Sequence, residues 1–216
     1  PMKYLTKYSI QIFLTTVLFE GIAFGVGNSP YLFETIDITA GLSQNSGMTI
    51  TKDKHGFIWI GTEDGLDRYD GISFKHFRHN SQDSTSINSN SILCSLTDRA
   101  GDLWIGTYAT GLNRYVYETE SFIHYPESST DSLSIGQGSI FALHEDHDGN
   151  IWIGTELSGL FRLNPKSGMI QPLSDLVKND INVSNDQVLS IFEDHLNQLW
   201  IGTNGGLNVL DLNRFE

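Results

Sequence analysis

Histidine and aspartate side chains gather at one recurring place in this 216-residue chain, and these residue types could together bind a metal ion. They are His55 beside Gly56, the segment Asp146-His147-Asp148-Gly149-Asn150, and Asp194-His195. A metal site would need several such groups to converge within about 2.0 to 2.6 Å of one ion. Each group belongs to a separate sequence repeat, and a lone Asp-x-Asp-Gly lacks the remaining ligands of a calcium loop. We therefore interpret these residues as turn formers and expect neither a metal nor a cofactor.

The sequence contains no familiar catalytic signature. It has no glycine-rich phosphate loop between a strand and a helix, no Gly-x-Ser-x-Gly elbow and no His-Glu-x-x-His pair. The one cysteine, Cys94, lies in the apolar run Ile92-Leu93-Cys94-Ser95-Leu96, so an internal disulfide is excluded and a buried small side chain is expected. We predict no catalytic residue and no enzymatic activity in this chain.

The charge balance restricts the partners. Thirteen basic residues against 26 acidic ones give a net charge of −13. Such a surface repels phosphate backbones and anionic membrane surfaces. We expect no nucleic acid partner, and membrane attachment only through a parent receptor.

The four tryptophans lie in copies of one phrase, Trp-Ile-Gly-Thr. Each is preceded six residues earlier by an aspartate and followed by Gly-Leu, and the intervals between them are 45, 48 and 48 residues. Tandem periods of this size indicate repeated units that stack side by side. Tryptophans could serve as stacking platforms for sugars, but a residue repeated in every unit favours shared packing. The tryptophans interpreted as structural are Trp59, Trp104, Trp152 and Trp200.

Each repeat contains four strand-like runs separated by turns. In the third copy the runs are Ser139–Glu145, Asn150–Thr155, Leu160–Leu163 and about Met169–Leu173. Glycine, or Asn197 in the last copy, stands in the first turn three residues before the tryptophan, where positive φ is expected. A long polar connection follows each repeat and carries a recurring apolar residue, which we expect to anchor it: Ile87, Ile135 and Val183.

Four antiparallel strands per period of this length predict an all-β fold, a β-propeller with four four-stranded blades. The blades are expected at about 41–78, 88–126, 136–174 and 184–216 within a region 31–216. Phe33 and Ile36 look like part of an outer strand, so residues 31–37 are expected to close a ring. A four-bladed ring is one alternative, and the favoured one is a truncated piece of a larger ring.

The first 27 residues differ from the repeats. Lys3 and Lys7 precede an apolar stretch from Ile10 onward, and Ala23-Phe24-Gly25 offers small residues near a cleavage site. Residues 1–27 are expected to be an export signal; the alternatives are an uncleaved anchor and a buried strand or helix. The run is short for a spanning helix, which needs about 20 residues.

The phrase Asp-x-x-Gly-x-(Leu/Ile)-Trp-Ile-Gly-Thr, with Gly111-Leu112-Asn113-Arg114-Tyr115 after it, resembles the two-component regulator propeller repeat. The resemblance covers about residues 31 to 216. That family builds periplasmic sensor domains of bacterial hybrid histidine kinases and of some membrane-bound diguanylate cyclases. The resemblance implies an exported, periplasmic, ligand-sensing module whose parent is anchored in the inner membrane and whose output enzyme lies outside this chain.

The face built from the long connections and the turns between second and third strands is the expected binding surface. Its residues vary while the framework around them repeats, which is where recognition can differ between blades. The candidate ligand-binding residues are Glu63, Asp64, Tyr108, Glu156 and Asn204. The expected partner is a small molecule or an oligosaccharide, and a second propeller could pair with this one as a dimer. The rival interpretations are a propeller lyase similar to streptogramin-inactivating enzymes and a protein-binding scaffold.

Overall fold

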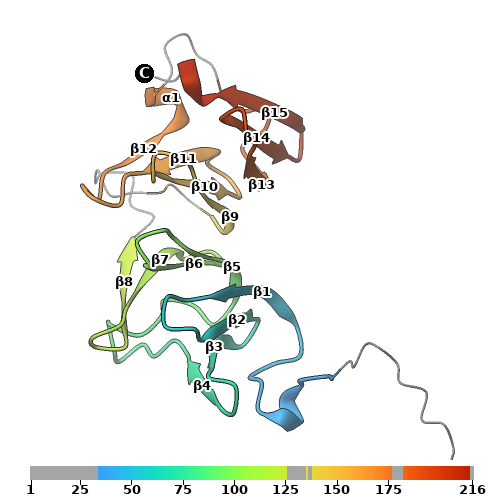
Figure 1. Ribbon diagram of the computed structural model, residues 1–216, viewed down its shortest axis with the longest axis vertical. Coiled ribbons are helices and arrows are strands. Elements are labelled where there is room, and N and C mark those ends of the chain that lie inside the picture. The colour runs from blue at the N-terminus through green and yellow to red at the C-terminus, as the bar shows by residue number, and fades with distance from the viewer. Residues whose placement is uncertain (1–33, 126–134, 136–137, 177–181, 215–216) are drawn as a thin grey trace, which may run out of the picture. The chain divides into compact units, whose positions relative to one another are not determined.

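The computed structural model describes residues 34–125, 135, 138–176 and 182–214 (Figure 1). The predicted export signal, residues 1–27, lies outside this part of the chain. The molecule divides into a unit of residues 1–35 and a unit of residues 36–216, and all elements described below belong to the second unit. Within the described residues, no helix is both long and apolar enough to cross a membrane.

The strands form antiparallel sheets, each made of consecutive strands, which we call blades 1 to 4 (Figure 1). Blade 1 contains β1 (Gly47–Lys52), β2 (Ile58–Thr62), β3 (Gly65–Tyr69) and β4 (Phe74–Phe77). Blade 2 contains β5 (Ile92–Thr97), β6 (Leu103–Thr107), β7 (Gly111–Val116) and β8 (Ser121–Tyr125). Blade 3 contains β9 (Ile140–Glu145), β10 (Ile151–Thr155), β11 (Leu160–Leu163) and β12 (Ile170–Pro172). Blade 4 contains β13 (Val188–Glu193), β14 (Gln198–Thr203) and β15 (Gly206–Asp211).

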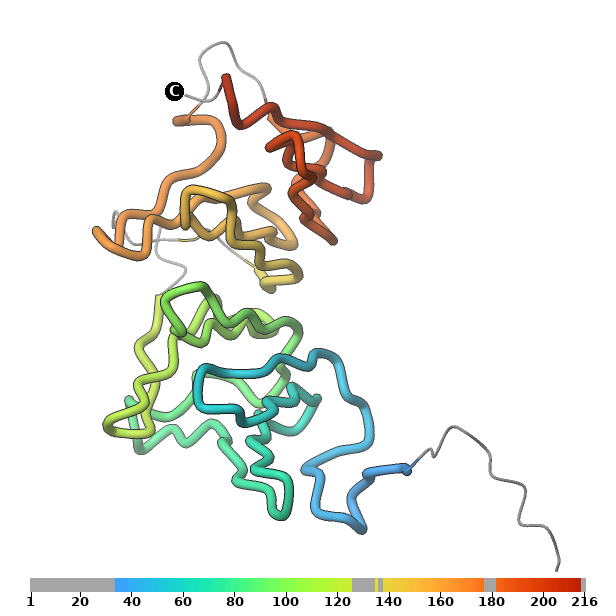
Figure 2. The backbone as a smooth tube through the Cα atoms, in the orientation of Figure 1, coloured from blue at the N-terminus to red at the C-terminus, as the bar shows by residue number. Residues whose placement is uncertain are grey.

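The all-β propeller architecture predicted from the repeats is confirmed. Each tryptophan lies in the second strand of its blade and faces a first-strand residue at the same register, as in the pairing of Trp104 with Leu96. The first turn places its glycine at positive φ, 88° for Gly101, and Asn197 takes the same conformation at 60°. The chain passes from each blade to the next in sequence order (Figure 2).

Blade 4 differs from the expected four-stranded form, since its described part has three strands. Residues 34–37, which were expected to belong to a closing outer strand with 31–33, form no strand. Instead Asp37 caps the short 3-10 helix η1 (Ile38–Ala40), because its carboxylate accepts the N–H groups of Thr39 and Ala40. Two short helical turns, α1 (Leu173–Leu176) and η2 (Leu212–Arg214), follow β12 and β15, where only strands and loops were expected.

The second strands hold neighbouring blades together through alternation of their side chains. In β6, Trp104 packs with Ile151 and Ile153 of blade 3, whereas Leu103 and Ile105 pack with Trp59 of blade 1. Successive side chains of a strand point to opposite faces, so one Leu-Trp-Ile phrase serves two interfaces. Trp152 packs in the same way against Leu199 and Ile201 of blade 4.

The first strands of consecutive blades also lie beside one another, β1 next to β5, β5 next to β9 and β9 next to β13. Thr49 and Ser95 share a hydrogen bond of 2.9 Å across the first of these seams, and the Cys94 thiol donates to the carbonyl of Ile140 across the second at 3.4 Å. Burial raises the pKa of the Cys94 thiol to about 12, so the thiol stays protonated at neutral pH. Cys94 therefore packs in the interface between blades 2 and 3, although its side chain is half-buried where a buried one was expected.

The long connections are anchored by the recurring apolar residues. Ile87 and Ile135 are buried, and Val183 packs against the core between blades 3 and 4. The connection after blade 1 also runs along the outer strand of blade 2, where Phe122 donates its N–H to Thr85 and His124 contacts the carbonyl of Ser86. These contacts hold in place the loops of the face on which the candidate ligand-binding residues are expected.

Candidate functional site

The aspartate six residues before each tryptophan organises the turn between the first and second strands. One carboxylate oxygen accepts the indole N–H, at 2.8 Å for Asp53 and Trp59 and 2.9 Å for Asp98 and Trp104. The other oxygen accepts a backbone N–H from within the turn, such as that of Asp102 at 2.8 Å. The carboxylates of Asp53 and Asp98 are buried, so these bonds compensate for the loss of water. The aspartate of each repeat therefore holds the first turn to the second strand.

The threonine that ends each second strand organises the opposite end of the blade. Its hydroxyl donates to the carbonyl of the glycine at the start of the third strand or directly before it, at 2.7 Å from Thr107 to Gly111 and 2.9 Å from Thr155 to Gly159. The residues directly after the threonine are thereby presented at the turn. All five candidate ligand-binding residues follow a threonine of this kind.

These turns meet the loops that enter the blades, as the topology predicted. The backbone N–H of Tyr108 donates to Ser91, that of Glu156 to Ser139, and that of Asn204 to Gln187, at 2.9 to 3.0 Å. The same bond recurs because each pair occupies the same position in its repeat. The result is a polar rim on the side of the blades away from the Asp-Trp turns.

A hollow of about 440 Å³ opens on this rim where blades 3 and 4 adjoin. Two of the candidate residues, Glu156 and Asn204, line it together. The sequence did not identify the other four lining residues, Leu157, Asn185, Asp186 and Gln187. Two carboxylic acids, three amides and one exposed leucine give the hollow many hydrogen-bonding groups and one apolar contact.

Glu156 is held in place by a buried serine. The hydroxyl of Ser139 donates to the Glu156 carboxylate at 2.7 Å, and its backbone N–H donates to the same oxygen at 3.3 Å. The Ser139 hydroxyl also accepts the N–H of Ala109, in the turn of blade 2 that carries Tyr108. Ser139 therefore links the turns of blades 2 and 3.

The remaining candidates lie at equivalent turns outside this hollow. Tyr108 is exposed in blade 2. In blade 1, the Asp64 carboxylate accepts a hydrogen bond from Arg78 at 2.9 Å, and Glu63 accepts one from Gln44 at 3.2 Å. The structure thus brings together two of the five predicted residues and places the other three on earlier blades.

The histidine and aspartate residues of the first turns lie at the other end of the blades. His144, His147, Glu193, Asp194 and His195 contribute to a second hollow of about 350 Å³. Among the described residues, no group of three or more His, Cys, Asp or Glu side chains has the geometry to hold a metal ion. This hollow is separate from the one lined by Glu156 and Asn204.

Comparison with known proteins identifies the repeats. The family model described as two-component regulator propeller matches residues 86–109, 134–156 and 182–205. A protein named histidine kinase P4 from Formosa agariphila is 45% identical over 69 residues, which are 32% of this chain and 5% of that protein.

Solved structures agree. The extracellular domain assigned to a hybrid two-component system from B. thetaiotaomicron is 30% identical, with a TM-score of 0.74, over 87% of this chain and 26% of that one. Virginiamycin B lyase from Staphylococcus aureus is 15% identical, with a TM-score of 0.54, over 76% of this chain and 55% of the lyase, and this likeness concerns the fold alone.

The chain therefore spans about a quarter of the solved signalling domain and a small fraction of the kinase. The matched segments run from the anchored connection through the first and second strands into the turn that carries the candidate residues. Three segments of the chain are thus two-component regulator propeller repeats, and its fold is that of the solved extracellular domain of a hybrid two-component system.

Proposed function

We propose that this chain is a ligand-sensing, non-catalytic module of an exported, periplasmic signalling receptor, and that the hollow between blades 3 and 4 takes part in binding the ligand. The observation that carries the proposal is the convergence of Glu156 and Asn204, from equivalent turns of adjacent blades, on one hollow. The extracellular location of the solved relative and the kinase relative support an extracytoplasmic sensor with a kinase output. A cyclic-dinucleotide output is the alternative for the parent protein.

The lining favours a neutral or positively charged ligand rich in hydroxyl or amine groups. Glu156 and Asp186 bring negative charge to a protein with a net charge of −13, which disfavours sulfated or uronate ligands. Amides such as those of Asn185 and Asn204 can donate and accept hydrogen bonds with neighbouring hydroxyl groups. A neutral oligosaccharide fits this chemistry.

Isothermal titration calorimetry with neutral, amino and anionic oligosaccharides tests the proposal. We expect binding of a neutral or amino sugar, and weakening by Glu156→Gln or Asn204→Ala of about 5- to 150-fold, as for the loss of buried hydrogen bonds worth about 1 to 3 kcal/mol. Glu63→Gln is the matched control because Glu63 has the same position in blade 1 but does not line the hollow. Equal weakening by all three variants, or binding confined to anionic sugars, would contradict the assignment of this hollow.

A further inference from the structure

Two of the interfaces between neighbouring blades have the same pairing at their first turns. Between blades 2 and 3, and again between blades 3 and 4, the residue after the turn aspartate of one blade contacts the residue before the turn aspartate of the next. Between blades 2 and 3, the Arg99 guanidinium lies 3.0 Å from the Glu145 carboxylate, and the backbone N–H of Arg99 donates to the same carboxylate at 2.8 Å. Between blades 3 and 4, His147 and Glu193 take these two positions.

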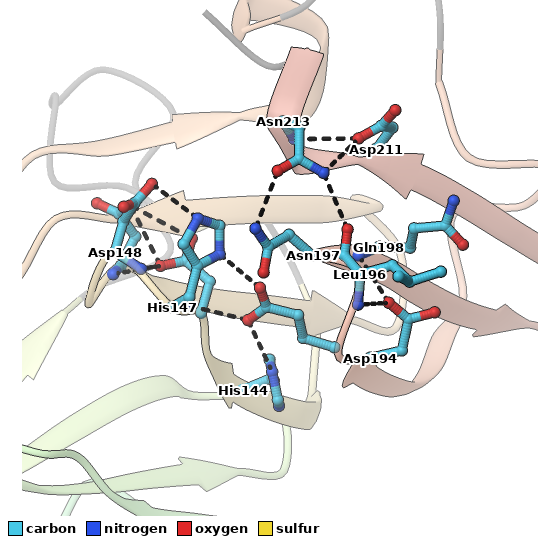
Figure 3. A network of polar contacts seen from close by, with 12 residues as sticks. His144, His147, Asp148, Asp194, Leu196, Asn197, Gln198, Asp211 and Asn213 are labelled. Carbon is cyan, nitrogen blue, oxygen red and sulfur yellow. Dashed lines mark hydrogen bonds and ion pairs between the residues drawn. The ribbon is translucent and has the colours of Figure 1, made fainter.

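The second pairing copies the geometry of the first. The His147 N–H donates to one Glu193 oxygen at 2.9 Å, and Nδ1 of the imidazole lies 2.5 Å from the other oxygen (Figure 3). Between blades 1 and 2 the corresponding residues are Lys54 and Thr97, and Lys54 lies over the Tyr117 ring instead. The cation of the pairing is therefore arginine between blades 2 and 3 and histidine, which can lose its charge near neutral pH, between blades 3 and 4.

The surroundings of His147 are rich in charge. Its Nε2 lies 3.5 Å from the Asp148 carboxylate, and its backbone carbonyl accepts a hydrogen bond from Arg99 at 3.0 Å. Glu145 and Asp146 precede it on blade 3. The hollow beside it is also lined by groups of blade 4, Asp194 and His195. Glu193 is the nearer of the two carboxylates that contact the imidazole, and acidic groups around His147 are more numerous than the one arginine.

A second histidine contacts the same glutamate. His144, on β9, points toward Glu193, with Nε2 at 3.8 Å from a carboxylate oxygen (Figure 3). That nitrogen is buried and makes no hydrogen bond among the described residues. The positions equivalent to His144 in blades 1, 2 and 4 are Thr51, Leu96 and Phe192, none of which titrates.

We propose that His147, Glu193 and His144 form a pH-responsive clamp between blades 3 and 4. Protonated His147 makes a charge-assisted hydrogen bond to the Glu193 carboxylate, beside the bond from its backbone N–H. Loss of one imidazole proton leaves a neutral ring, whose contact with Glu193 is weaker. The clamp lies at the opposite end of the blades from the hollow lined by Glu156 and Asn204, so the inference does not rest on the proposed ligand site.

His147 and His144 make contributions to stability that change with pH in opposite directions. The contact with Glu193 raises the pKa of His147, so its stabilising contribution is present below the unfolded value of about 6.5 and is lost as the pH rises through the folded pKa. Burial lowers the pKa of His144, so its contribution is present above about 6.5 and is lost as the pH falls toward the folded pKa. The interface between blades 3 and 4 is expected to be most stable near pH 6.5, about the pKa of an unfolded histidine.

Amide hydrogen exchange of the full chain, corrected for intrinsic rates and followed from about pH 5.5 to about pH 8.5, tests the clamp. The His147 amide reports the interface between blades 3 and 4. The Arg99 amide is an internal control because its acceptor, the Glu145 carboxylate, is paired with arginine and not with histidine. We expect protection of the His147 amide to fall by about 1.4- to 5-fold on the alkaline side, the range for partly exposed ion pairs. Protection of the Arg99 amide should stay constant.

Two variants introduce residues that the chain already uses at equivalent positions. His147→Arg, which repeats the choice of arginine at Arg99, should abolish the alkaline loss of protection. His144→Leu, which repeats the choice of leucine at Leu96, should abolish only the acid-side loss. An unchanged profile in His147→Arg would overturn the proposal. So would loss of the alkaline response in His144→Leu, since His144 would then be the titrating group.

Discussion

At the scale of single residues, the aspartate of each repeat has a larger role than the sequence indicated. The aspartate has a constant spacing from the tryptophan, and in the sequence its ability to form turns accounts for its recurrence. The structure adds the bond from the indole N–H to the carboxylate, which joins the two sides of the first turn. A buried indole that loses this acceptor has no water to replace it.

Replacing Asp98 by alanine should lower the free energy of unfolding by about 1 to 3 kcal/mol, the cost of a buried donor left without a partner. Trp104 is fully buried, and its N–H donates to Asp98. Asp194→Ala is the matched control, because Trp200 makes the same bond while only partly buried, so water can take the place of the carboxylate. Urea denaturation of both variants gives the comparison, and equal losses would contradict the explanation.

At the scale of elements, the glycine of Trp-Ile-Gly-Thr sets how closely the blades approach. A Cβ at Gly106 would lie 2.5 Å from the Cys94 sulfur and 2.7 Å from a methyl group of Ile140 in the next blade. Gly61 and Gly154 face Ile92 and Val188 in the same way. The first strand of each following blade therefore packs into the space that this glycine leaves.

Gly106→Ala should destabilise the chain by about 1 to 3 kcal/mol, as expected for overpacking of a close-packed interface. Gly202→Ala is the control, since the nearest atom to its added methyl group is the Ser190 hydroxyl of its own blade. A serine hydroxyl can rotate away, so a smaller loss is expected there. Thermal unfolding followed by circular dichroism distinguishes the two, and a larger loss for Gly202→Ala would refute this account of the glycine.

At the scale of the whole molecule, the outer face of blade 4 carries the apolar pattern of an interface. Leu207 is 64% exposed, whereas its equivalent in blade 3, Leu160, is 1% exposed because blade 4 covers it. Phe192 and Val209 are exposed beside the partly buried Trp200. Exposed apolar area of this kind favours association at about 25 cal/mol per Å².

The isolated chain should therefore self-associate as its concentration rises, and Leu207→Lys should weaken that association without loss of stability. Leu160→Lys is the matched variant, and it should unfold the chain because it places a charge inside the interface between blades 3 and 4. Sedimentation velocity gives the first outcome and thermal unfolding the second. A wild-type chain that stays monomeric at about 100 μM would contradict the prediction.

The sequence by itself determined the repeat, the strand order within each blade, the turn glycines and the anchoring role of Ile87 and Ile135. These properties are local, because a turn or a strand depends on residues within one period. It also identified the face on which Glu156 and Asn204 lie, since antiparallel connectivity fixes which loops share an end of the blade.

Only the tertiary structure decided which residues of different blades come together. Glu156 adjoins Asp186 and Gln187, and His147 reaches Glu193, 46 positions away. Trp200 is less buried than its three equivalents, although its sequence context is the same. The physical reason is that one period encodes one blade, whereas burial, ion pairing and the binding hollow depend on the side chains that the adjacent blade brings to the seam.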